Sequence, residues 1–75
     1  MKDLNKLVAM NIRALRKHRK LTQAEMADRA GISKGYLGDL ELNRKASMSL
    51  NTLQSIAKKL DVTVHQLLDE EGVKK

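Results

Sequence analysis

Residues 23–42 of this 75-residue chain have the sequence QAEMADRAGISKGYLGDLEL, which is the most informative part of the chain about its fold. Its pattern predicts two short helices separated by a break of about three residues. Ala27 is small enough to let the second helix cross the first closely, and Gly31 stands where the chain must turn with a positive φ. Leu37 and Leu40 give the second helix an apolar inner face. These spacings indicate a helix-turn-helix, although many ordinary helical hairpins also contain an alanine and a glycine.

Apolar residues at helical spacing also occur on both sides of this stretch. A Thr-x-x-Glu capping box at Thr22 and a Thr-x-x-Gln box at Thr63 mark two helix starts. No segment alternates with period two, so the sequence predicts one all-α domain over residues 1–75. The charged tail, 69–75, is expected to fray. The five expected helices cover about residues 4–19, 22–30, 34–42, 50–60 and 64–68.

The composition limits the possible function classes. The chain has no cysteine and no proline, and its one aromatic residue is a tyrosine. Disulfides and cysteine-ligated metals are therefore excluded, and the core must be aliphatic. The longest apolar runs have four residues. Such runs are too short for a membrane span or a signal peptide, so we expect a cytoplasmic protein.

The excess positive charge lies near the N-terminus. Residues 1–20 hold seven basic residues and one acidic residue, and they therefore account for the whole net charge of +6. A basic segment of this kind suggests nucleic acid, an anionic membrane or an acidic protein as a partner. An ordinary solvated helix face explains it equally well. A membrane ranks last among these partners because the segment has no aromatic anchors.

The residues needed for catalysis or metal binding are scarce. His18 and His65 are the two histidines, and the carboxylates are scattered over helix faces and the tail. No glycine-rich phosphate loop follows a strand. We therefore expect no enzymatic activity, no metal and no cofactor, and we expect both histidines to be solvated.

Several motifs stand in an order typical of one family. The chain resembles the Cro/phage-repressor-type (XRE-like) family over roughly residues 7–68. That resemblance implies a compact, five-helix, lambda-repressor-like DNA-binding domain that usually acts as a dimer. The matching motifs are IRALRK (12–17), LTQAEMA (21–27), GIS (31–33), YLGDLE (36–41), SLNTL (49–53) and IAKKLDVTVHQLL (56–68).

The resemblance assigns base contacts to the first exposed positions of the helix after the turn, which in this family enters the major groove. Lys34 can donate to guanine O6 and N7 or to a phosphate, or it can remain a solvated lysine. Tyr36 can pack on a thymine methyl group, reach a phosphate or pack on the protein itself. Asp39 can accept from cytosine N4 or orient a neighbour. The implied base-contacting residues are Ser33, Lys34, Gly35, Tyr36 and Asp39.

The resemblance also assigns phosphate contacts. The family uses the glutamine at Gln23 to bind a phosphate beside a helix N-terminus, and simple helix capping is the alternative. Arg44 and Lys45 match the family's backbone-contacting loop after the recognition helix. Together with Lys17, these residues would fix the register on the duplex without reading its sequence.

An ion pair is expected between two helices. Val8, Ile12 and Arg16 form one i+4 row on the first helix, and Leu37 and Glu41 form another on the third. Each charge therefore continues a row that faces the core. A half-buried charge is costly unless it is paired, and an arginine fork suits a carboxylate. The family pairs residues at these two positions, so we predict an Arg16–Glu41 salt bridge.

The chain departs from the family pattern at five positions. Lys20, Asn43 and Asp61 stand where the family often has glycine, and lysine tolerates the left-handed region least. Gly35 and Gly38 lie inside the recognition helix, where glycine disfavours helix. We predict that this helix is less rigid than its neighbours without DNA. Alternatively, the two glycines allow a close approach to DNA.

The function predicted from these features is a sequence-specific, double-stranded DNA-binding transcriptional regulator of a bacterial or phage system. It would bind a palindromic operator as a homodimer, with half-sites roughly 34–36 Å apart. The expected dimer surface includes Val64, Leu67, Leu68 and Val73. The alternative is that these residues complete the monomer core, which we favour for Leu67. An antitoxin-like or adaptor module with a protein partner is the alternative function.

Overall fold

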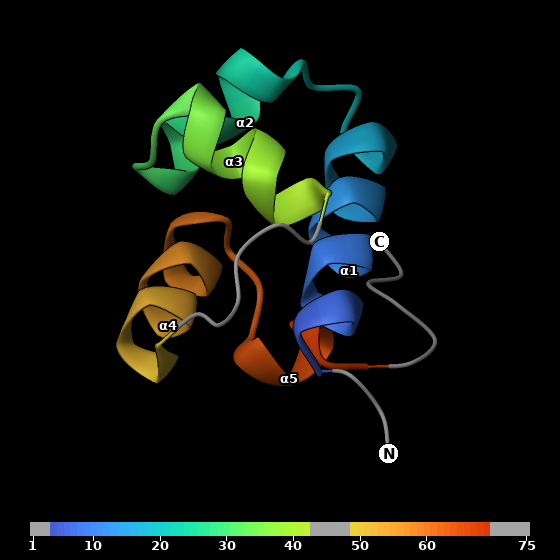
Figure 1. Ribbon diagram of the computed structural model, residues 1–75, viewed down its shortest axis with the longest axis vertical. Coiled ribbons are helices and arrows are strands. Elements are labelled where there is room, and N and C mark those ends of the chain that lie inside the picture. The colour runs from blue at the N-terminus through green and yellow to red at the C-terminus, as the bar shows by residue number, and fades with distance from the viewer. Residues whose placement is uncertain (1–3, 43–48, 70–75) are drawn as a thin grey trace.

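The computed structural model describes residues 4–42 and 49–69, and these ranges fold into helices with no strand (Figure 1). The predicted all-α architecture is confirmed, and most helices end one residue before their expected limit because that residue forms the C-cap. Asn43, Arg44, Lys45 and Val73 lie outside the described residues, as does most of the charged tail. The helices are α1 (Leu4–His18), α2 (Gln23–Ala30), α3 (Lys34–Glu41), α4 (Leu50–Lys59) and α5 (Val64–Leu67).

Hydroxyl side chains set the starts of α2 to α5. Thr22, Ser33, Ser49 and Thr63 adopt extended backbone conformations as N-caps, and each side-chain oxygen accepts a hydrogen bond from the N–H three residues later. This bond satisfies one of the backbone donors that a helix start leaves without a partner. Both predicted capping boxes are present, at α2 and α5.

Left-handed residues terminate α1, α2 and α4. The φ angles are 57° at Lys20, 72° at Gly31 and 60° at Asp61. Lys20 and Asp61, where the family often has glycine, thus adopt the backbone conformation that glycine favours. In each case the following N–H bonds a carbonyl five residues back, as in a Schellman motif. The three bonds are Leu21 N to Arg16 O (3.1 Å), Ile32 N to Ala27 O (3.0 Å) and Val62 N to Ala57 O (2.9 Å).

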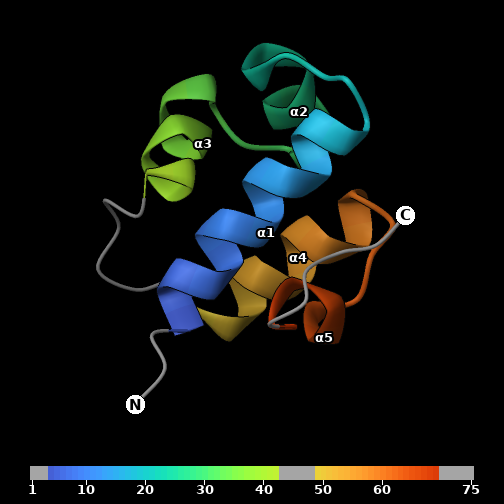
Figure 2. The same ribbon diagram turned by 90° about the vertical axis from the view of Figure 1, so that its right-hand side faces the viewer.

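α1 packs against α3 and α5, while α2 packs against α3 and α4, and α4 also packs against α5. Figure 1 shows α2 and α3 together at one end and α4 and α5 at the other, and Figure 2 shows α1 running past all of them. Ala27 is buried in α2, and α2 packs against α3. Leu67 is fully buried and belongs to the monomer core. The core is aliphatic: Val8, Ile12, Leu15, Met26, Ala27, Ala30, Leu37, Leu40, Leu53, Ile56, Ala57, Leu60 and Leu67.

A buried asparagine fastens the last helix to the first. The side-chain amide of Asn11 donates to the carbonyl of Leu67 at 2.6 Å and to that of Asp69 at 3.0 Å. Both carbonyls lie at the C-terminal end of α5, where a helix leaves acceptors unpaired. The four-residue helix α5 therefore depends on α1 for its position. The sequence did not predict this role, although Asn11 interrupts the apolar i+4 row between Leu7 and Leu15.

Candidate nucleic-acid interface

The outer side of α3 presents most of the residues predicted to contact bases. Ser33, Lys34 and Gly35 are exposed, whereas Tyr36 and Asp39 are half-buried. Helical spacing puts Gly35 at the centre of the outward face, opposite the buried Leu37, Leu40 and Glu41. The structure therefore places four of these residues on α3 and Ser33 at its N-cap, with Ser33, Lys34 and Gly35 open to a partner.

Two of these residues also have structural roles. The hydroxyl of Ser33 accepts the N–H of Tyr36 at 3.0 Å, which starts α3 and leaves the hydroxyl proton free to donate elsewhere. Tyr36 packs partly against the aliphatic core. Its ring therefore supports the first turn of α3 in addition to any contact with a ligand.

The residues predicted to contact phosphates are spread over several elements. Lys17 is exposed in the last turn of α1, and Gln23 is half-buried as the first residue of α2. The side chain of Gln23 lies against α3, the helix that carries most of the residues predicted to contact bases. Arg44 and Lys45 are outside the described residues.

The predicted Arg16–Glu41 ion pair is present and joins α1 to α3. Arg16 Nε donates to Glu41 Oε2 at 2.7 Å, and Arg16 Nη2 donates to Glu41 Oε1 at 3.0 Å. The side chains are 15% and 3% exposed, respectively. The hydrogen bond from the guanidinium to Glu41 raises the pKa of Arg16, against the opposing effect of burial. Such a bidentate pair fixes both position and orientation.

Two further hydrogen bonds extend this pair into a network. Arg16 Nη1 donates to the carbonyl of Leu21 at 3.1 Å, which holds the connection between α1 and α2. Gln23 Nε2 donates to Glu41 Oε1 at 3.2 Å. One buried carboxylate therefore meets side chains from α1 and α2. The sequence predicted the ion pair but not the contact with Gln23, because Gln23 belongs to no apolar row.

The start of α2 carries an exposed capping box. Glu25 accepts the backbone N–H of Thr22 at 2.8 Å, and Thr22 Oγ1 accepts the N–H of Glu25 at 3.1 Å. The backbone hydrogen bond from Thr22 lowers the pKa of Glu25 because it stabilises the ionised carboxylate. The first turn of α2 is therefore fixed by local interactions beside Gln23.

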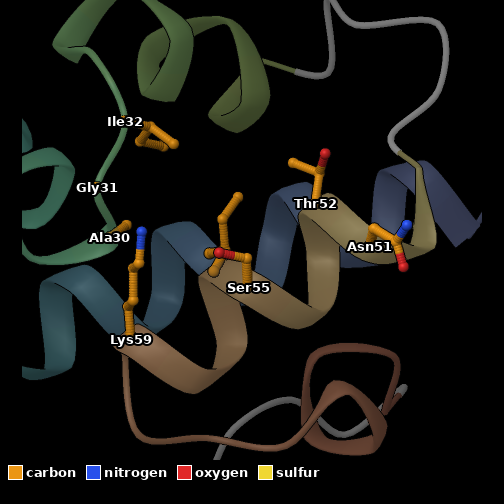
Figure 3. Close-up of a pocket in the computed structure, with 8 residues that line it drawn as sticks. Ala30, Gly31, Ile32, Asn51, Thr52, Ser55 and Lys59 are labelled. Carbon is orange, nitrogen blue, oxygen red and sulfur yellow. The ribbon is translucent and has the colours of Figure 1, made fainter.

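An open groove of about 320 Å³ lies between α4 and the turn that joins α2 to α3. Figure 3 shows Lys59 extending from α4 towards Ala30 and Gly31. A Cβ atom placed on Gly31 would lie 2.6 Å from Lys59 Nζ, so the lysine side chain covers this turn. Its ammonium group stands near the C-terminal end of α2, where a positive charge is favourable. The groove is lined by Ala30, Gly31, Ile32, Asn51, Thr52, Ser55, Ile56 and Lys59.

The described residues offer neither a metal site nor a membrane span. Within residues 4–42 and 49–69, no three histidine, cysteine or acidic side chains are grouped so that they could hold a metal ion. His18 and His65 are both exposed, as predicted. In the same ranges, none of the helices has the length and apolar character needed to cross a bilayer.

Known proteins resemble this chain in sequence. A helix-turn-helix family model matches residues 12–67. An immunity repressor protein of Bacillus phage phi105 is 42% identical over 64 residues, which is 85% of this chain and 44% of that protein. Control protein C.SmaI of Serratia marcescens is 32% identical over 72 residues, which is 96% of this chain and 84% of that protein.

A solved structure also matches the fold. The crystal structure of SinR, a master regulator for biofilm formation, in complex with DNA superposes with a TM-score of 0.72 at 35% identity. The match covers 83% of this chain and 98% of the SinR chain in that structure. This chain spans about half the length of two of its curated relatives, with 44% of the phage repressor and 59% of SinR from Bacillus subtilis.

Proposed function

Since this chain belongs to the helix-turn-helix family, we propose that it is a sequence-specific, double-stranded DNA-binding transcriptional regulator. The observation that carries this proposal is the exposed start of α3, a helix whose last residue, Glu41, is buried and paired with Arg16 of α1. A helix that is packed firmly on its inner side and exposed on its outer side is suited to reading the major groove. The resemblance to SinR, whose crystal structure contains DNA, supports the same function.

The proposed base contacts come from the outward face of α3. Lys34 donates to guanine O6 and N7, and Asp39 accepts from cytosine N4 in the same half-site. Ser33 donates its hydroxyl proton while its oxygen caps the helix. Gly35 lies at the centre of the face in open space, and its lack of a side chain lets the helix backbone approach the base edges. Tyr36 supports the first turn and contacts the edge of the site.

The proposed phosphate contacts surround α3. Gln23 binds a phosphate oxygen at the start of α2, where backbone N–H groups also favour an anion. Lys17 adds a positive charge from the last turn of α1, and Arg44 and Lys45 complete the set from outside the described residues. Such contacts fix the register of α3, and they make the affinity fall steeply with rising salt concentration.

We place this regulator in the cytoplasm of a bacterium, acting as a homodimer on a palindromic operator. Leu67 is excluded from the dimer surface because it is buried in the monomer core. Val64 and Leu68 are half-buried and remain candidates for that surface. A two-fold dimer would place its two recognition helices about one helical turn of DNA apart, roughly 34–36 Å.

Selection of bound duplexes from a random pool tests this function. We expect the selected sites to share a palindrome, and Lys34→Ala should relax one base position in each half-site at a cost of about 1–3 kcal/mol. Lys58→Ala changes an exposed lysine on α4 and serves as the matched control. A pool with no enriched sequence would contradict the proposal. Co-purification with another protein in that case would favour an antitoxin or adaptor role instead.

A further inference from the structure

The side chain of Gln23 is held against the recognition helix by Glu41. One amide N–H of Gln23 donates to Glu41 Oε1 at 3.2 Å across the contact between α2 and α3. Gly38 lies beside this amide, and a Cβ atom placed there would make ordinary van der Waals contact with Gln23 Nε2 at 4.0 Å. Gln23 is half-buried, so its amide is partly enclosed by protein and partly open to the surface.

The chemistry of the carboxylate decides which way the amide points. An ionised carboxylate can only accept hydrogen bonds, whereas a glutamine amide has a donor end and an acceptor end. A reversed amide would place the oxygen of Gln23 against the oxygen of Glu41, which is repulsive. Glu41 therefore keeps the nitrogen of the amide at the α2–α3 contact, with its second N–H available for an acceptor outside the protein.

Arg16 keeps Glu41 in place for this task. Its Nη2 atom donates to Oε1, the same oxygen that accepts from Gln23, and its Nε atom donates to Oε2. The carboxylate is 3% exposed, so it is shielded from water and cannot turn without breaking both bonds. The positive charge of Arg16 also offsets the negative charge that would otherwise repel a nearby phosphate.

We infer that Glu41 is a positioning residue for DNA binding, which orients the amide of Gln23 so that its second N–H donates to a phosphate oxygen. Glu41 itself does not touch the duplex. The inference rests on the proposed function, because it assigns the buried ion pair a second role in setting DNA affinity. It predicts that the effects of Gln23 and Glu41 on affinity are coupled.

A double-mutant cycle on DNA affinity tests this coupling. The variants are Gln23→Ala, Glu41→Gln and the double variant, measured by fluorescence anisotropy on a selected duplex at a temperature where circular dichroism shows all of them folded. Gln23→Ala should weaken binding about tenfold, as expected for one lost phosphate hydrogen bond. Glu41→Gln should weaken binding roughly threefold alone and less than about twofold when Gln23 is already alanine. If Glu41→Gln weakens binding by the same factor with glutamine and with alanine at position 23, the inference is overturned.

Gln54→Ala is the matched control, because Gln54 is an exposed glutamine on α4 and its loss should leave affinity unchanged. Lys34→Ala separates the two claims. Suppose that the wild-type chain selects a duplex, that Lys34→Ala weakens binding to it, and that the effects of Gln23→Ala and Glu41→Gln are additive. The positioning role of Glu41 is then wrong, and the proposed function stands. If the wild-type chain selects no duplex, both fail.

A measurement without DNA gives a second readout. In ¹⁵N-labelled protein, the two side-chain amide protons of Gln23 should be more widely separated in chemical shift than those of Gln54, since one of them is bound to Glu41. Glu41→Gln should reduce that separation. Unchanged Gln23 amide resonances in this variant would show that Glu41 does not orient the side chain, and would overturn the inference whatever the affinities.

Discussion

The two helices of the helix-turn-helix have the same length but are stabilised in different ways. α2 begins with a complete capping box, contains no glycine and ends at the left-handed Gly31. α3 begins with Ser33 alone and contains Gly35 and Gly38, and its C-cap Leu42 has a φ of −91°. Both helices contain eight residues. The local signals for helix formation are therefore strong in α2 and weak in α3.

Tertiary contacts compensate for the weak local signals of α3. Its inner side buries Leu37 and Leu40 in the core, and Glu41 joins it to α1 through Arg16. The outer side contributes little to this anchoring, and that is the side with the residues proposed to contact DNA. A helix that is anchored by the contacts of its inner side can expose its outer side to a ligand without losing its position. The contrast leads to five predictions, ordered by expected size.

Removing the anchor of α3 should have the largest effect. Glu41→Ala leaves the guanidinium of Arg16 half-buried without its partner, and removing one member of a buried pair costs about 3 kcal/mol in free energy of unfolding. Urea denaturation followed by circular dichroism measures this loss. Asp39→Ala, which removes a half-buried carboxylate from the same helix, is the control and should cost less than about 1 kcal/mol. A loss for Glu41→Ala no larger than that of the control would mean that α3 is not anchored by the ion pair.

The end of α2 should show the next largest effect. Gly31→Ala forces an alanine into the left-handed region at φ 72°, which costs about 1–2 kcal/mol. The overlap with Lys59 adds little, because the atom nearest the new Cβ is the end of a flexible side chain. Lys59→Ala in the same chain should therefore not restore stability. Thermal melts of the single and double variants measure both effects.

Lys20→Gly is the complementary control for this turn motif. Lys20 adopts φ 57° at the end of α1, so replacing it with glycine relieves strain and should raise stability by about 0.5–1 kcal/mol. Opposite signs for Gly31→Ala and Lys20→Gly are expected because the two positions share one backbone conformation. The same sign for both would rule out the left-handed conformation as the cause.

The features that sequence could predict are those set by nearby residues or by regular spacing. The caps at Thr22 and Thr63 and the turn at Gly31 follow from local chemistry. The pair of Arg16 and Glu41 could be found because each residue continues an apolar i+4 row. Asn11 and the hydrogen bond from Gln23 to Glu41 were missed because their partners are a carbonyl and a side chain brought near by the packing of whole helices.

A substitution that favours helix formation within α3 should raise the free energy of unfolding, by less than Glu41→Ala lowers it. Gly35 has open space around a Cβ position, so Gly35→Ala should raise the free energy of unfolding by about 0.5–1 kcal/mol. It should also slow amide hydrogen exchange in α3, which we expect to be faster than in α4 in the unmodified chain. Exchange in α3 that is already as slow as in α4 would contradict the view that its local signals are weak.

The smallest effect concerns the pH dependence of the two helix starts. The backbone N–H of Thr22 lowers the pKa of Glu25 below its ordinary value of 4.5. A carboxyl group whose pKa is lower in the folded state stabilises the fold above its unfolded pKa, and this contribution is lost as the pH falls through the folded pKa. The amide resonance of Thr22 should therefore follow a titration with a midpoint below 4.5, and Glu25→Gln should abolish it. The amide of Ser33 should show no such transition, because Tyr36 occupies the equivalent position in α3 and carries no carboxylate. A matching acid transition at Ser33 would mean that the two helix starts do not differ in the way their sequences indicate.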